Sequence, residues 1–228
     1  MIRHYVKVAV RNLVKQKGLS FINIIGLSIG LACFILFLLF AVNEFSYDRF
    51  HRNAASIYRV CEWIQGMPGR EPSGQAFGGT PIGPALKADF ADVKEYVRVQ
   101  SSFSEKFVKA GESVSRSGLA FADPTLFQIF SFKLIQGNAA TALNDPHKVV
   151  LTKEKAIQLF GTTDAIGKRI DIKVENEFVP FTVGAVADDL PSNSSIRFSI
   201  LGSYAYIMTT DMGKQSLDNW HMSIGSET

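Results

Sequence analysis

The chain has 228 residues, of which 46% are hydrophobic and 20% are charged, enough for one ordinary domain or two small lobes with a core. Its net charge of +3 does not indicate a nucleic-acid partner, because the basic excess lies entirely before an apolar stretch near the N-terminus. The residues after that stretch are slightly acidic.

Residues 1–18 have the pattern of an amphipathic helix, with apolar residues recurring on one face. The other face is basic and carries Arg3, Lys7, Arg11, Lys15 and Lys17. Such a helix can lie in the headgroup layer of a lipid bilayer, with its cations toward anionic lipid. We predict a cytoplasmic interfacial helix that ends near Gly18; a simple basic topology signal is the alternative.

Residues 19–42 contain no charge and no proline, and as a helix they cover roughly 36 Å, enough to cross a bilayer. A cleaved signal peptide would have a shorter apolar region and a small-residue cleavage site, which this segment lacks. The sequence therefore predicts one transmembrane helix. The preceding cations place the N-terminus in the cytoplasm and the residues after 43 outside it.

One side of this helix carries small and polar residues, namely Asn23, Gly26, Gly30 and Cys33. Their spacing matches a small-xxx-small face, which lets another helix approach closely. The pattern favours a packed span, although glycine is also common in unpacked membrane helices. Cys61 lies beyond the span, so no disulfide with Cys33 is expected.

An aromatic and charged cluster follows the span: Phe45, Tyr47, Asp48, Arg49 and Phe50. Its rings suit the outer headgroup level, and Asp48 with Arg49 suits a local ion pair or cap. His51 is interpreted as a solvated polar residue.

Residues 43–228 alternate between strand and helix patterns, which predicts a mixed α+β domain. Strands are expected at 56–64, 96–100, 106–110, 113–122, 131–135, 148–151, 169–174, 178–186 and 196–204, and helices at 81–90, 123–129, 152–160 and 205–211, with a last strand beginning near 220. The strand–helix–strand order over 56–100 is typical of a ferredoxin-like unit. Asp123 and Thr152 are predicted helix N-caps, and Gly161 a C-cap.

No pattern predicts catalysis, a cofactor or a metal site. Residues 161–169 (GTTDAIGKR) have the wrong spacing for a phosphate-binding loop and lack its final Ser or Thr. The four histidines are scattered, and Asp188 and Asp189 precede a polar segment that is typical of a solvated turn. We therefore expect a protein that is not an enzyme.

Several short motifs occur in a characteristic order: residues 9–13 (AVRNL), 21–32 (FINIIGLSIGLA), 47–51 (YDRFH), 57–60 (IYRV), 122–124 (ADP), 149–152 (VVLT) and 189–194 (DLPSNS). In this order the chain resembles the FtsX/MacB-like ABC transporter permeases of bacteria, in the version abundant in Bacteroidota. The resemblance extends over nearly the whole chain.

The resemblance implies an inner-membrane permease subunit whose residues 43–228 form a two-lobed periplasmic core domain with strand–helix–strand units. It also implies a separate cytoplasmic ABC ATPase, further spans of the same permease and a homodimer. In such permeases, ATP hydrolysis moves the periplasmic domain for export or efflux. This chain has one span and no ATPase motif, so it is interpreted as the N-terminal part of a permease, with its core domain truncated.

Two other functions are considered. A single-pass sensor or binding receptor would explain one span and an outer domain, but not the ordered motifs. A secreted hydrolase would need a nucleophile motif, and none is found.

Overall fold

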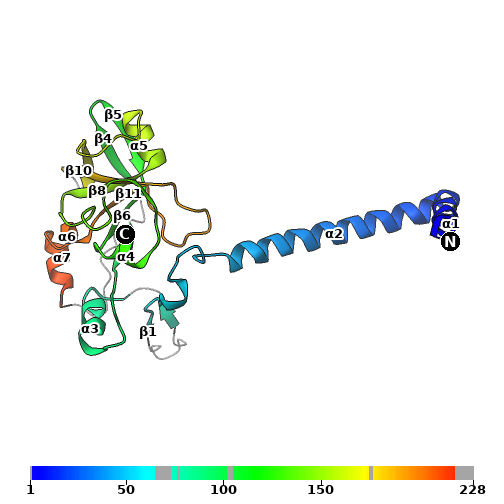
Figure 1. The fold of residues 1–228 in the computed structure, drawn as a ribbon, viewed down its shortest axis with the longest axis horizontal. Helices are drawn as coiled ribbons and strands as arrows, with labels where there is room; N and C mark the ends of the chain where they lie inside the picture. Colours follow the sequence, from blue (N-terminus) through cyan, green and yellow to red (C-terminus); the bar gives the residue numbers. More distant parts are fainter. Residues whose placement is uncertain (1, 65–72, 76–77, 102–104, 175–176, 219–228) are drawn as a thin grey trace. The chain divides into compact units, whose positions relative to one another are not determined.

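The computed structural model describes residues 2–64, 73–75, 78–101, 105–174 and 177–218. The chain divides into two compact units, Met1–Tyr47 and Asp48–Thr228 (Figure 1). The first unit is helical, and the second combines helices with sheet. This composition confirms the predicted α+β class with one long N-terminal apolar helix.

The first unit consists of α1 (Ile2–Lys15) and α2 (Lys17–Phe45). Among the described residues, α2 is the one helix long and apolar enough to cross a membrane, and none of its side chains is buried within the protein. The predicted break at Gly18 was wrong. The helices separate at Gln16, and Gly18 lies inside α2, because glycine lowers helix propensity without forbidding a helix.

The second unit is built on one mixed sheet in the order β3-β6-β11-β8-β10-β9-β4-β5, with β7 paired to one end of β10. The strands are β3 (Val99–Ser101), β4 (Lys106–Ala110), β5 (Ser113–Ser117), β6 (Leu119–Ala122), β7 (Leu134–Gln136), β8 (Lys148–Thr152), β9 (Arg169–Val174), β10 (Glu177–Ala187) and β11 (Ile200–Ser203). Two neighbouring pairs are parallel, β6 with β11 and β8 with β10. The other ladders are antiparallel.

The sheet is strongly curled, because β5 and β6 follow each other in the chain yet lie far apart in the strand order. Only Gly118 separates them in the chain. Residues 113–122 therefore form one bent strand whose two halves lie near opposite ends of the strand order. Glycine at a bend is a recurrent way to turn a strand from one part of a sheet to another. The carbonyl of Gly118 accepts from the amides of Ser199 and Ile200, at 3.2 and 3.1 Å.

The central strands β6, β8 and β11 are buried on both faces. Alternate residues of these strands enter two different hydrophobic clusters. One cluster includes side chains of α5 (Lys153–Phe160) and α6 (Tyr204–Ile207), and the other includes Leu126 of α4 (Leu126–Ile129) and Phe132. The fold therefore has a sheet between two apolar layers, which explains the continuous apolar runs in these strands.

Local signals placed several elements correctly. The Thr152 hydroxyl accepts from the Lys155 amide at 3.3 Å, and Gly161 closes α5 with φ of 71°. Both caps confirm the prediction, since a side-chain oxygen satisfies a free amide and glycine adopts the left-handed region without strain. The predicted hairpins appear as β4–β5 and β9–β10.

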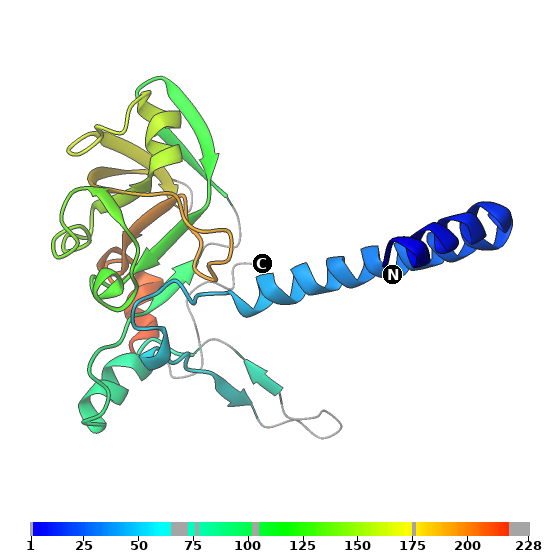
Figure 2. The same cartoon turned by 45° about the vertical axis from the view of Figure 1, so that its right-hand side comes forward.

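The expected unit over residues 56–100 takes a different form. Only Glu62–Ile64 (β1) of the predicted first strand forms a ladder, and it pairs with an unpredicted strand, β2 (Ser73–Gln75). The helix is present as α3 (Ile82–Asp89), but the next strand, β3, belongs to the large sheet. Figure 2 shows β1 and β2 in cyan, away from that sheet. The predicted strand near 220 lies outside the described residues.

Other differences concern boundaries and one cap. β7 and β11 are shorter than predicted, and the expected last helix is two helices, α6 and α7 (Asp211–Ser216). Asp123 does not cap α4. Its carboxylate instead accepts from the backbone amide of Arg98 at 2.8 Å and from its guanidinium at 2.9 and 2.7 Å.

Candidate functional site

The first residues of the second unit are tied to two distant parts of its chain. We call residues 48–52 the anchor segment. Asp48 has a left-handed backbone, with φ of 56°, and its amide donates to the Asn193 carbonyl at 3.0 Å. Its carboxylate accepts from the Ser195 amide at 2.9 Å. These two contacts attach the start of the unit to Asn193 and Ser195, which lie 145 and 147 positions later in the chain.

The segment to which Asp48 is hydrogen-bonded, residues 188–197, is itself held by further hydrogen bonds. The Asp188 amide donates to the Lys133 carbonyl at 2.8 Å, and Asp189 accepts from the Glu154 amide at 2.9 Å. The Arg197 guanidinium donates to two carbonyls within the same segment, those of Ser192 and Ser194. These contacts connect the segment to the residue before β7, to α5 and to itself, so it is a fixed loop with several exposed side chains.

His51 forms the second attachment of the anchor segment, and the prediction that it is solvated was wrong. The residue is only 4% exposed. Its Nδ1 accepts from the Ser131 amide at 3.1 Å, and its ring centroid lies 4.9 and 5.1 Å from those of Phe130 and Phe132. The Arg52 amide donates to the Ser131 hydroxyl at 2.9 Å, which completes this second attachment.

Burial makes this attachment sensitive to pH. Desolvation lowers the pKa of His51 below its usual value, and the nearby Asp48 carboxylate, 4.0 Å from Nε2, opposes this effect only in part. The folded protein then binds fewer protons than the unfolded chain once the pH falls below about 6.5. We expect the free energy of unfolding to decrease as the pH falls from about 6.5 toward the lowered pKa of His51.

This dependence can be isolated by comparison with His51→Asn, which keeps an acceptor near the Ser131 amide but does not titrate. Urea denaturation of the chain in detergent micelles at a series of pH values gives both profiles. The wild type should lose stability more steeply than the variant below pH of about 6.5. Parallel profiles would show that His51 does not contribute.

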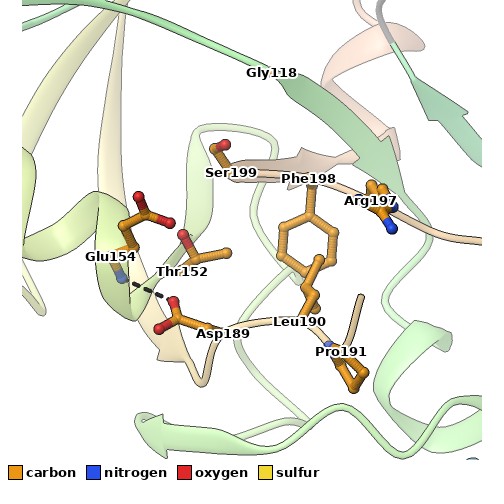
Figure 3. A pocket seen from close by; sticks show the side chains of 9 residues that line it. All are labelled: Gly118, Thr152, Glu154, Asp189, Leu190, Pro191, Arg197, Phe198 and Ser199. Atoms are coloured by element: carbon orange, nitrogen blue, oxygen red, sulfur yellow. Dashed lines mark hydrogen bonds between the residues drawn. The ribbon is translucent and has the colours of Figure 1, made fainter. Parts of the chain in front are cut away.

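An open cavity of about 330 Å³ lies beside the same fixed loop. Figure 3 shows the residues that line it. They come from the end of β8, the first turn of α5, the loop and the residues just before β6 and β11: Gly118, Thr152, Glu154, Asp189, Leu190, Pro191, Arg197, Phe198 and Ser199. In this view the Asp189 carboxylate points to the backbone of Glu154, where it accepts its hydrogen bond. Two charged side chains of the lining, Asp189 and Arg197, are thus engaged in hydrogen bonds within the protein.

The remaining predicted site residues are distributed as follows. The basic side chains Arg3, Lys7, Arg11 and Lys15 are exposed on α1, and Lys17 is the first residue of α2. The predicted packing face of α2, Asn23, Gly26, Gly30 and Cys33, is exposed, and nothing lies within 4 Å of a Cβ added at either glycine. Its role in packing stays a prediction.

The aromatic residues that follow the span differ in their exposure. Phe45 and Tyr47 are exposed, by 71% and 39%, which suits the predicted place at the headgroup level. Phe50 is half-buried, and its ring lies 4.0 Å from that of His51 and 6.2 Å from that of Phe132. The partners of Asp48 are Asn193 and Ser195 rather than a neighbouring arginine.

Sequence reasoning missed Asn193, Ser195 and Ser131 as parts of the site. Of these three residues, Asn193 alone had a signal in the sequence: the 47–51 and 189–194 motifs both occur in the ordered set, and the structure brings them together. In the described part of the chain, no group of three or more His, Cys, Asp or Glu residues could hold a metal ion. The hydrogen bonds of Asp48, His51 and Arg52 attach the anchor segment to Ser131, Asn193 and Ser195.

Comparison with known proteins identifies the family. The model of the MacB-like periplasmic core domain matches residues 20–225. A solved domain described as part of a permease protein from Porphyromonas gingivalis is similar with a TM-score of 0.57 and 23% identity, covering 72% of this chain and 69% of that one. No curated protein matches the chain.

Two further structures are more distant. The periplasmic region of MacB from Actinobacillus actinomycetemcomitans has a TM-score of 0.43 and 18% identity, covering 59% of each chain. The extracellular domain of the noncanonic ABC-type transporter YknZ from Gram-positive bacteria has a TM-score of 0.43 and 16% identity, covering 58% of this chain and 65% of that one. On the family match over residues 20–225, the chain belongs to the MacB-like periplasmic core domain family, that of the FtsX/MacB-like ABC transporter permeases.

Proposed function

We propose that this chain is the N-terminal part of a permease subunit that transmits ATP-driven motion from a cytoplasmic ABC ATPase to its periplasmic domain, for export or efflux. In this proposal α1 lies on the cytoplasmic surface of the inner membrane, with its basic side chains toward anionic lipid. α2 crosses the membrane and packs against further spans of the same permease. Residues after 43 lie in the periplasm, and the complete permease acts as a homodimer.

The observation that carries the proposal is the attachment of Asp48. Three residues after α2 ends at Phe45, the backbone and the carboxylate of Asp48 both bond to the fixed loop of residues 188–197. A flexible linker at this point would absorb any displacement of the membrane helix. A hydrogen-bonded attachment, supported by buried His51, transfers such a displacement to the sheet that carries the loop.

The proposal is tested on the complete permease reconstituted with its ATPase in lipid nanodiscs. Hydrogen–deuterium exchange is measured with ATP and vanadate and again with ADP. We expect the amide exchange of residues 188–197 to differ between the two states. Asp48→Gly, which accepts the left-handed backbone without strain but lacks the carboxylate, should greatly reduce this difference while ATP hydrolysis continues.

Asp164→Ala is the matched control, because Asp164 is exposed and lies in a different loop. It should behave like the wild type. Exchange in residues 188–197 that is the same in both nucleotide states would contradict the proposal. A change caused by an extracellular ligand, without any nucleotide dependence, would instead favour the single-pass receptor.

A further inference from the structure

One face of the sheet combines cations with exposed apolar side chains, and none of the functions above uses it. The face is formed by the outward side chains of β5, β4, β9 and β10. We call it the cationic face, and it consists of Phe107, Lys109, Val114, Arg116, Arg169, Asp171, Lys173, Phe178, Pro180 and Thr182.

Alternation along the strands defines the cationic face. In β4, Val108 and Ala110 are buried whereas Phe107 and Lys109 are exposed, and in β9 Ile170 and Ile172 are buried. α5 lies against the opposite side, because Lys155 donates from its ammonium to the Ser115 hydroxyl at 3.0 Å. Figure 1 shows α5 beside the β4–β5 hairpin. No described helix covers the outward side chains.

Pairing across the strands brings cations next to aromatic rings. Phe107 lies opposite Arg116, whose guanidinium carbon is 4.8 Å from the ring centroid. Phe178 lies opposite Lys173. Phe107, Val114 and Phe178 are 40%, 57% and 50% exposed, which is unusual for three large apolar side chains on one solvated face.

The charge of the cationic face is strongly unbalanced. It has four cations, Lys109, Arg116, Arg169 and Lys173, against the single carboxylate of Asp171. That carboxylate is already bonded to the Arg169 guanidinium, at 2.9 Å. Other acidic residues, Glu105 and Glu112, lie before β4 and in the β4–β5 turn. In the described part of the chain, the other three cations, Lys109, Arg116 and Lys173, form no ion pair with a carboxylate and lie beside apolar surface.

We propose that the cationic face binds an acidic segment of a partner protein whose carboxylates alternate with apolar side chains. Carboxylates on that segment pair with Lys109, Arg116 and Lys173, while its apolar side chains contact Phe107, Val114 and Phe178. Exposed aromatic residues with arginine are the composition that favours protein–protein contacts. The inference goes beyond the proposed transport function, and its test involves neither nucleotide nor ATPase.

The test uses the full chain in nanodiscs of neutral lipid and a fluorescein-labelled peptide in which Glu alternates with Phe and Leu. Fluorescence anisotropy gives the dissociation constant. The double variant Lys109→Glu and Lys173→Glu should weaken binding by about tenfold or more, because two attractions become repulsions. Phe107→Ala should also weaken binding, and raised salt should weaken it for the wild type.

The matched control reverses two exposed lysines elsewhere, Lys94→Glu and Lys153→Glu, and should bind the peptide like the wild type. A peptide with Lys in place of Glu should not bind. If the charge reversal impairs folding, seen by circular dichroism, Lys109→Gln with Lys173→Gln replaces it and should weaken binding by a smaller factor.

The proposal is overturned if the control weakens binding as much as the face variant, or if the wild type does not bind the peptide. It is also overturned if reversing Lys109 and Lys173 mainly reduces the amount of protein that floats with anionic vesicles. That result would assign the face to lipid binding. Self-association that depends on these lysines, measured by sedimentation, would assign it to a second copy.

Discussion

Replacing Asp123 by alanine is expected to lower the free energy of unfolding by about 3 kcal/mol. The Asp123 carboxylate accepts three hydrogen bonds from Arg98, and the two side chains are only 11% and 21% exposed. The Arg98 guanidinium also lies over the Tyr204 ring, at 4.2 Å. Without Asp123, a largely buried guanidinium would have neither its carboxylate nor full access to water.

Urea denaturation of the chain in detergent micelles, followed by near-ultraviolet circular dichroism, measures this loss. Asp164→Ala, at an exposed aspartate, should change the free energy of unfolding by no more than about 0.5 kcal/mol. The double variant Arg98→Met with Asp123→Leu should recover part of the loss, because it leaves neither charge buried alone. An unchanged denaturation midpoint for Asp123→Ala would refute this account of the pair.

Phe181→Ala should have a similar or larger effect, about 3–5 kcal/mol. Phe181 is 1% exposed in the long strand β10, and its ring centroid lies 5.0 Å from that of Tyr206 in α6. Tyr206 in turn stacks on Phe121 of β6, at 5.8 Å. The truncation would leave a cavity where these rings join β10, α6 and β6.

Phe90→Ala is the matched control, because that ring is 57% exposed at the end of α3. It should change the free energy of unfolding by less than about 0.5 kcal/mol. The same denaturation experiment measures both variants. Equal losses for Phe181→Ala and Phe90→Ala would mean that the ring cluster does not organise the core.

The sequence predicted the elements that depend on local signals. Thr152 and Gly161 mark the ends of α5 correctly, because capping needs only neighbouring backbone groups. The hairpin of β9 and β10 follows from alternation on both sides of a polar turn. The ordered motifs identified the family, although no single motif would have done so.

Predictions failed where the partner lies far along the chain. Residues 57–61 have strong β propensity but no described ladder, since propensity alone does not provide a neighbouring strand. His51 looked solvated because Phe130 and Phe132, which bury it, are about eighty residues away. The partners of Asp48 lie 145 and 147 residues later in the chain, and the partner of Asp123 is Arg98, 25 residues earlier, so neither contact is visible in the local sequence.

The strand order also has a consequence for the order of folding. β11 lies between β6 and β8, so without it the sheet separates into a β3–β6 pair and a larger group around β10. Its parallel neighbour β6 was synthesised about eighty residues earlier, and such distant parallel pairing is slow. During synthesis, the apolar edges of both groups therefore remain open until residues 200–203 are available. We expect this interval to be the period in which the newly made protein is most exposed to aggregation and most dependent on chaperones.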